Sequence, residues 1–180
     1  MTTRPLETKR PAALLDLDYS DGEGMVVTSP GPGSATGQAF SERSIADATL
    51  DAEVGLLEGE AEDRFGLFFR QTAPERYLAC TLSAAGHLSL GAVDGGPPLI
   101  IAERQLDPLI HFQGSLGNTT RITIVACGPV AAVIVNEVTV LGAVLDSRYV
   151  AGRVGALLVH TSSSPRARLA VRWAQARAFI

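Results

Sequence analysis

The stretch at residues 65–93 constrains the fold most, because apolar side chains alternate with other side chains along three successive segments. Successive side chains of a β-strand point to opposite faces of the sheet, so residues of one parity share a face. We place a turn at residues 71–76, which sets Arg70 opposite Tyr77 in an antiparallel pair. The wholly apolar parity predicts the buried face, formed by Phe65, Leu67, Phe69, Leu78, Cys80, Leu82, Leu88, Leu90 and Ala92. The mixed parity predicts the outer face, formed by Gly66, Phe68, Arg70, Tyr77, Ala79 and Thr81.

The rest of the chain repeats this pattern of short alternating segments between turns. Residues 121–127 and 130–136 flank Gly128-Pro129, which predicts a second hairpin. Residues 29–37 and 58–64 are predicted to be loops, the first from its Gly and Pro content and the second from its charge. Further strands are predicted at residues 14–19, 25–27, 49–56, 99–101, 138–145, 153–160 and 169–173. The pattern predicts an all-β sandwich or jelly roll.

Length, charge and hydropathy bound the domain count and the class of partner. The 180 residues fit one domain, which we place at residues 13–180 after a flexible tail at residues 1–12. The formal net charge is −4, and basic and acidic residues are well mixed along the chain. The absence of a basic stripe argues against a nucleic-acid partner. No apolar run is long enough to span a membrane, and no secretory signal pattern follows the first residues. We therefore expect a cytoplasmic protein without a membrane partner.

Parity also predicts the faces of the two cysteines and of Trp173. Cys80 falls in the core set, whereas Cys127 has the parity opposite to Ile124. In a reducing compartment we expect both thiols to be free and buried or half-buried. Trp173 shares its parity with Leu169 and Val171 and is predicted to be a core residue.

A series of short motifs resembles the concanavalin A-like lectin/glucanase superfamily, near its LamG-like modules and its keto-disaccharide-hydrolase-like bacterial domains. The resemblance covers residues 14–175 and implies a jelly roll of two antiparallel sheets with adjacent first and last strands. The superfamily mixes glycosidases, lectins and structural modules, so the fold does not decide the function. The motifs are LLDLDYSDG at residues 14–22, DATLDAEV at 47–54, FGLFFR at 65–70, Arg76-Tyr77, GHLSL at 86–90, Asn118, RITI at 121–124, VIVN at 133–136, Asp146 and GRVG at 152–155.

Glu58, Glu60 and Glu62 are the main enzyme signal, because laminarinase-type glycosidases of this superfamily carry an alternating acidic triad on one strand. The carboxyl groups of a retaining pair lie about 5–5.5 Å apart, which positions i and i+4 of an extended strand exceed. No apolar residues interleave here to bury the other face of such a strand. We predict a solvated acidic loop and no catalysis, with a glycoside hydrolase as the lesser alternative.

A calcium site is the one cofactor that the sequence suggests. Asp16, Asp18 and Asp21 could supply the hard oxygen ligands that calcium prefers. The spacing departs from an EF-hand loop, because Asp21 stands where that loop needs Gly. An Asx-type turn after an edge strand explains the same residues. The three histidines, His87, His111 and His160, show no spacing of metal ligands.

The outer face of the predicted meander is the candidate ligand surface. It would present Phe68, Arg70 and Tyr77, with His87 beside them. Aromatic rings stack on sugar rings, and a guanidinium donates paired hydrogen bonds. The same residues also suit a cross-strand Arg70–Tyr77 pair or a contact with a protein partner. We predict a non-catalytic module that binds a glycan or a protein, with a structural subunit of a homo-oligomeric or larger assembly as the alternative.

Overall fold

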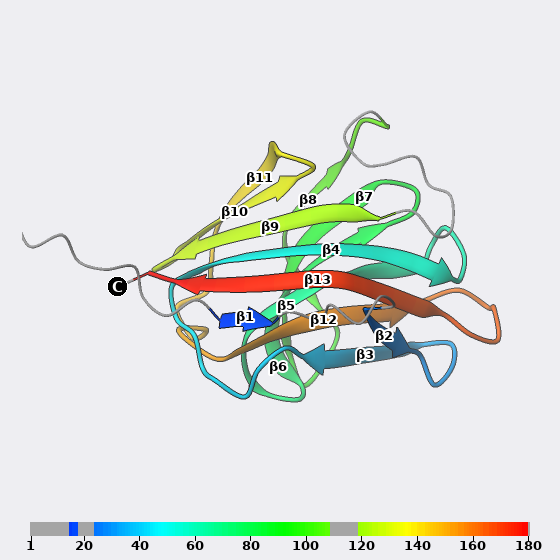
Figure 1. The fold of residues 1–180 in the computed structure, drawn as a ribbon, viewed down its shortest axis with the longest axis horizontal. Coiled ribbons are helices and arrows are strands. Elements are labelled where there is room, and N and C mark those ends of the chain that lie inside the picture. The colour runs from blue at the N-terminus through cyan, green and yellow to red at the C-terminus, as the bar shows by residue number, and fades with distance from the viewer. Residues whose placement is uncertain (1–14, 18–23, 109–118, 180) are drawn as a thin grey trace, which may run out of the picture.

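The computed structural model describes residues 15–17, 24–108 and 119–179. These residues form two antiparallel sheets, which lie one behind the other in Figure 1. The first sheet has the order β1 (Leu15–Leu17), β13 (Arg168–Ala178), β4 (Ala48–Glu58), β9 (Thr120–Cys127), β10 (Val130–Val135) and β11 (Val138–Val144), with β2 (Met25–Thr28) also paired to β13. The second sheet has the order β3 (Ser34–Ala39), β12 (Arg153–His160), β5 (Arg64–Ala73), β6 (Arg76–Ser83), β7 (His87–Asp94) and β8 (Leu99–Gln105).

This architecture confirms the predicted all-β jelly roll of two antiparallel sheets. The first strand, β1, pairs with the last strand, β13, as predicted. The boundary between the tail and the domain stays a prediction, because residues 1–14 lie outside the described part. Within that part, no helix is long and apolar enough to cross a membrane.

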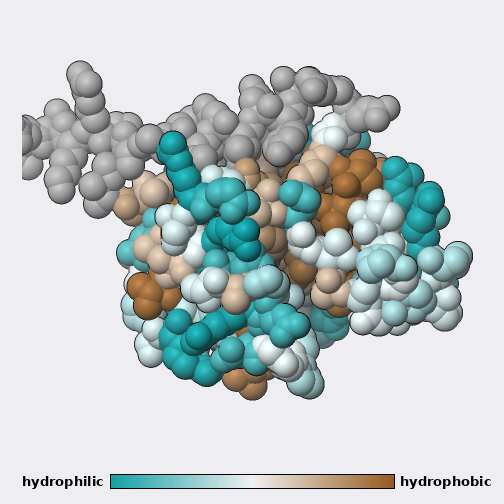
Figure 2. All heavy atoms as spheres, turned by 90° about the horizontal axis from the view of Figure 1, so that it is seen from below, coloured by the Kyte–Doolittle hydropathy of each residue, from teal (hydrophilic) through white to brown (hydrophobic). Residues whose placement is uncertain are grey.

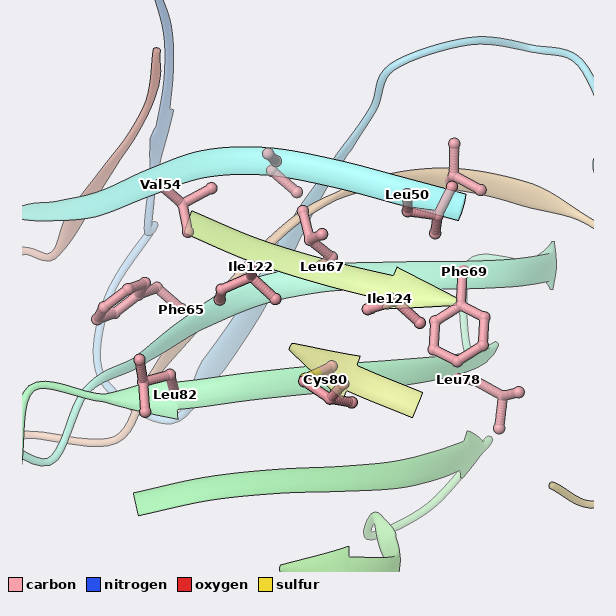
Figure 3. Packing of buried hydrophobic residues seen from close by; sticks show 14 of the residues in the cluster. Leu50, Val54, Phe65, Leu67, Phe69, Leu78, Cys80, Leu82, Ile122 and Ile124 are labelled. Carbon is pink, nitrogen blue, oxygen red and sulfur yellow. The ribbon is translucent and has the colours of Figure 1, made fainter. Parts of the chain in front are cut away.

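The core lies between the two sheets and follows from the alternation of apolar residues. Figure 3 shows side chains of β4 and β9 pointing toward those of β5 and β6. Leu78, Cys80 and Ile122 are fully buried there. A side chain of this kind contributes about 1.5–3 kcal/mol when it is fully buried. The apolar parity of the central meander therefore faces the core, as predicted.

The hairpin of β5 and β6 has the predicted register as far as Phe69, which pairs with Leu78. A bulge then shifts the register, so that Ala73 pairs with Arg76 and the turn is shorter than predicted. Arg70 lies in this bulge with a φ of 52°. Its side chain therefore does not stand on the outer face beside Tyr77, and the predicted Arg70–Tyr77 pair is wrong.

Trp173 also changes face through a bulge. The pairing of β13 with β4 shifts between Val171 and Trp173, which moves Trp173 out of the core parity. Its indole Nε1 donates to the Glu53 carboxylate at 2.9 Å, and the Arg121 guanidinium lies 5.4 Å from its ring centroid. The prediction that Trp173 is a core residue is wrong.

The segment predicted to be a loop at residues 29–37 contains most of strand β3. β3 is the edge strand of the second sheet and pairs with β12. Figure 2, seen from the side on which β3 lies in Figure 1, shows hydrophobic areas broken up by hydrophilic ones. β3 forms one wall of the groove described next.

Candidate functional site: a groove on the outer face of the second sheet

The outer face of the second sheet carries two adjoining hollows of about 400 and 490 Å³. Both are lined by Ala35 of β3, Tyr77 of β6 and Leu157 of β12, so together they form one groove with Tyr77 at its middle. Volumes of this size suit a small ligand or a few sugar rings. We call the hollow of 400 Å³ the β3–β5 hollow and the hollow of 490 Å³ the β6–β8 hollow.

Small residues make this face hollow, because they stand where larger side chains would fill the space. Gly155 of β12 lies directly opposite Phe68 of β5 in the sheet. A Cβ atom at Gly155 would lie 2.4 Å from Cζ of Phe68, and one at Gly37 would lie 3.2 Å from its Cε1. The Phe68 ring therefore covers two glycines of the neighbouring strands. This position explains why Phe68 is only 2% exposed although it stands on the outer face.

Tyr77 forms the centre of a small hydrophobic cluster on this outer face. The cluster also contains Phe68, Ala79 and Leu157. The ring centroids of Phe68 and Tyr77 lie 6.0 Å apart with an angle of 56° between the planes, a tilted geometry that aromatic pairs favour. Tyr77 is 8% exposed, and its burial raises the pKa of the phenol. Tyr77 thus offers the groove a narrow apolar strip with a neutral phenol.

The β6–β8 hollow has a polar cluster on its floor. The Arg64 guanidinium donates from Nη1 to the Ser89 hydroxyl at 2.8 Å. The hydroxyls of Ser89 and Thr81 lie 3.0 Å apart, and both residues are buried. Arg64 has the same parity as Gly66 and Phe68, so the alternation could have placed it on this face. We missed it because residues 58–64 read as a charged loop.

The β3–β5 hollow has a different polar lining. Arg153 donates from Nη1 to the Glu42 carboxylate at 3.1 Å, so its charge is neutralised locally. Amide side chains of Gln38 and Gln71 line the same hollow. The β3–β5 hollow therefore presents amide groups and a guanidinium paired with a carboxylate, whereas the β6–β8 hollow presents a guanidinium that no other charged residue of the described lining accompanies.

A buried hydrogen-bond network fixes the end of the groove where β3 and β12 meet. The two ring nitrogens of His160 both contact hydroxyl groups: Nδ1 lies 2.8 Å from the Ser29 hydroxyl, and Nε2 lies 3.1 Å from the Ser164 hydroxyl. Ser162 links Ser164 to the Asp63 carboxylate through contacts of 3.0 and 2.8 Å. His160 ends β12 and a polar loop follows, as the sequence predicts. The network therefore holds the loop between β12 and β13 against the loop before β5.

Asp63 is the charged anchor of that network. The carboxylate is buried and accepts hydrogen bonds from the backbone N–H groups of Glu60, Thr161 and Ser162. Burial alone would raise the pKa of Asp63, but these hydrogen bonds and that of the Ser162 hydroxyl bring it below its ordinary value. Asp63 is therefore ionised at neutral pH and has a structural role beside the groove.

Two of the four predicted ligand residues lie away from the groove lining. Arg70 is 3% exposed and donates to the backbone oxygens of Ala46 and Tyr149 at 3.2 and 2.9 Å, so it does not stand on the outer face as predicted. Its role as a ligand residue stays a prediction. His87 lies on the correct face but toward the sheet edge, where its Nε2 is 3.6 Å from the Glu103 carboxylate. Phe68 and Tyr77 do line the groove, with Phe68 as its floor.

The predicted acidic motif does not line this groove, and the predicted calcium motif lies mostly outside the described residues. Glu58 forms an ion pair with Arg166 at 2.9 Å, while Glu60 and Glu62 are exposed in the turn after β4. The acidic loop is therefore solvated at Glu60 and Glu62 but shorter than the predicted residues 58–64, because Glu58 ends β4 and Arg64 begins β5. Asp16 lies in β1, but its side chain and the whole of Asp18 and Asp21 are outside the described residues, so the calcium site stays a prediction. Among the described residues no group of three or more His, Cys, Asp or Glu could hold a metal.

Comparison with known proteins shows the fold. No family model matches the sequence, and no curated protein does. The structure is similar to the carbohydrate-binding module CBM66 from Bacillus subtilis, with a TM-score of 0.68 and 14% identity over 93% of this chain and 97% of that chain. It is also similar to a Bacillus subtilis protein of unknown function with a galectin-like fold, with a TM-score of 0.61 and 12% identity over 93% of this chain and 97% of that chain.

An enzyme is also among the similar structures. A Bacillus licheniformis beta-glucanase has a TM-score of 0.56 and 7% identity over 76% of this chain and 69% of that chain. At such identities the likeness concerns the fold and not the activity. The chain has the concanavalin A-like jelly-roll fold, as its sequence motifs predict.

Proposed function

We propose that this protein is a non-catalytic carbohydrate-binding module whose ligand lies in the groove centred on Tyr77. The observation that supports this function is the groove itself, which combines an apolar middle with hydrogen-bonding groups at both ends. Sugar rings have apolar faces and hydroxyl rims, so such a lining matches them in both respects. The likeness to a carbohydrate-binding module over nearly the whole chain supports the same function.

The carboxylates of the groove favour binding over hydrolysis. Glycosidases need two carboxyl groups across the scissile bond, about 5–5.5 Å apart in retaining enzymes and about 6.5–9.5 Å apart in inverting enzymes. Among the described residues that line the two hollows, the only carboxylate is that of Glu42. It is 85% exposed and paired with Arg153. A pair of carboxyl groups with distinct environments is not present in this lining.

The proposal is tested by filling the groove without disturbing the core. Ala35 is exposed and lines both hollows, so Ala35→Gln places a longer side chain in the groove. Val144→Gln is the matched control, because Val144 is 72% exposed and lies on β11 of the other sheet. We expect wild type and Val144→Gln to bind the same glycans on an array, with Ala35→Gln at least about tenfold weaker by calorimetry. Equal affinities for the two variants would disprove binding in the groove.

A protein contact is the second candidate function. The edge strand β8 exposes Leu99 and Ile100, whose exposed fractions are 64% and 45%. Unpaired edge strands with apolar side chains pair readily with another chain. Light scattering after size-exclusion chromatography separates the candidates: a concentration-independent oligomer that Ile100→Lys dissociates would favour assembly, whereas a monomer would leave the glycan function.

A further inference from the structure

The β6–β8 hollow is lined by a cation that forms no ion pair with another described residue. Of the described residues that line this hollow, only Arg64 is charged. The ion pairs between described residues all involve other side chains. The other arginine of the groove, Arg153, is neutralised by Glu42. Within the described part of the chain, the groove thus carries an unbalanced positive charge at one end.

The Arg64 guanidinium is held by buried groups of the neighbouring strands. Its Nη1 donates to Ser89 at 2.8 Å, and Ser89 is in turn held by Thr81 at 3.0 Å. A guanidinium has five N–H donors in a rigid planar fork, and the bond to Ser89 uses one of them. Ser89 and Thr81 therefore fix the position of the fork and leave donors for a ligand in the hollow.

The acidic groups near Arg64 are directed elsewhere. Glu103 of β8 stands opposite Ser89 in the sheet register. Its carboxylate lies 3.6 Å from His87 and is 59% exposed, which places it toward the sheet edge. Asp63, next to Arg64 in sequence, turns to the loop after β12 and accepts hydrogen bonds from Thr161 and Ser162. Neither carboxylate neutralises Arg64 in the hollow.

We propose that the β6–β8 hollow binds the carboxylate of an acidic sugar, a uronate residue, with Arg64 as the residue that determines this specificity. This inference rests on the proposed carbohydrate-binding function and names its ligand class. The planar fork of a guanidinium matches a carboxylate through two parallel hydrogen bonds. The sugar ring would then lie against Tyr77 and Leu157, which line the same hollow. The single guanidinium of Arg64 would pair with the single carboxylate of one uronate residue in the hollow.

The test compares acidic oligosaccharides with their own neutral forms. The probes are tetrasaccharides of galacturonate, mannuronate and glucuronate, each also prepared with its carboxyl groups reduced to alcohols. We expect wild type to bind at least one acid form at least about tenfold more tightly than its reduced form, which corresponds to one charge-assisted pair. This preference should weaken between 50 mM and 500 mM NaCl, because salt screens charges in an open groove.

Variants of Arg64 and of an arginine outside the groove assign the effect. Arg64→Gln should bind the acid and reduced forms with equal affinity, and Arg64→Lys should keep part of the preference. Arg166→Gln is the matched control and should keep the whole preference, because Arg166 is paired with Glu58 and lines neither hollow. Thermal melting confirms that each variant is folded. A preference that persists in Arg64→Gln would overturn the assignment of Arg64.

The remaining outcomes separate this inference from the proposed function. Equal binding of acid and reduced forms would overturn the uronate specificity and leave carbohydrate binding standing. Equally tight binding of a sulfated neutral tetrasaccharide would indicate selection of charge alone and overturn the carboxylate assignment. If no acid or reduced form binds, while neutral glycans bind on the array and Ala35→Gln abolishes that binding, only the uronate inference fails.

Discussion

We predict that Arg70 is a structural staple, meaning a side chain whose hydrogen bonds hold two loops against β5. Replacing Arg70 should therefore lower the free energy of unfolding far more than replacing an ordinary surface arginine. The guanidinium connects the bulge of β5 to two loops that approach β4 and β12. It donates to Ala46 O at 3.2 Å, Tyr149 O at 2.9 Å and the Asp47 carboxylate at 3.2 Å. Burial lowers the pKa of this guanidinium, and the Asp47 carboxylate offsets part of that effect. The staple therefore consists mainly of hydrogen bonds made out of contact with water.

The expected cost of Arg70→Ala is about 3 kcal/mol. The carbonyl of Tyr149, whose bond to Arg70 is buried, would lose its charged donor, and a buried group left without its partner costs about 1–3 kcal/mol. The partly buried bond to the carbonyl of Ala46 would also be lost. The pair with Asp47 adds little, because Asp47 is 40% exposed and such pairs contribute about 0–1 kcal/mol. Arg70→Gly should cost about 0.5–1 kcal/mol less than Arg70→Ala. Glycine relieves roughly 1–2 kcal/mol of backbone strain at a φ of 52°. Glycine also raises the conformational entropy of the unfolded chain, which offsets about 0.4–1 kcal/mol of that gain.

Urea unfolding followed by the fluorescence of Trp173 gives the free energy of unfolding of each variant. Arg166→Ala is the control, because Arg166 is 52% exposed and its pair with Glu58 should contribute less than about 1 kcal/mol. The denaturant slope m should stay the same in all variants, so that the difference reports stability. If Arg70→Ala and Arg166→Ala lost equal stability, or if Arg70→Gly were less stable than Arg70→Ala, the staple would be refuted.

Three further predictions concern thiols, acid stability and close packing. Burial raises the pKa of Cys80 to about 12, whereas Cys127 is exposed, so a thiol reagent should label one cysteine in the native protein and two in urea. The folded-state pKa of Asp63 lies below its ordinary value, so its stabilising contribution is present above about pH 4 and is lost as the pH falls through that lower pKa. Urea midpoints at pH 6 to 2 should therefore fall less steeply in Asp63→Asn than in wild type. Gly155→Ala would bring a Cβ within 2.2 Å of a backbone oxygen of β3 and should cost about 1–3 kcal/mol by thermal melting, while Gly96→Ala, which meets nothing within 4 Å, should not.

The alternation of apolar residues predicted the fold well because it reports which side chains are buried. The register of Phe69 with Leu78 follows from parity alone, since a shift by one residue would expose the whole apolar set. Cys80 is buried and free, as predicted, whereas Cys127 is exposed and not half-buried. Its position at the end of β9 explains the difference, because little of the sheet lies beyond it to cover the thiol.

The bulges could not be predicted, because their causes lie far away in the sequence. Arg70 leaves the outer face to reach carbonyl groups 24 and 79 positions away, which no local pattern reveals. Trp173 likewise leaves the core parity and bonds to Glu53, 120 positions away. β3 was missed for another reason: an edge strand needs no apolar alternation when one of its faces lines an open groove. Its small residues resemble those of a loop.

The bulge in β5 also explains the charge distribution of the groove. In a regular strand Arg70 would stand on the outer face next to Tyr77 and place a third guanidinium, besides those of Arg64 and Arg153, at the middle of the groove. The bulge turns that charge toward Ala46 and Tyr149, so the middle of the groove is apolar. Arg64, at the other end of the same strand, stays on the outer face with Ser89 as its neighbour. A ligand with a charge at one end and a neutral ring next to it therefore has one favourable direction in this groove, with its anionic end at Arg64.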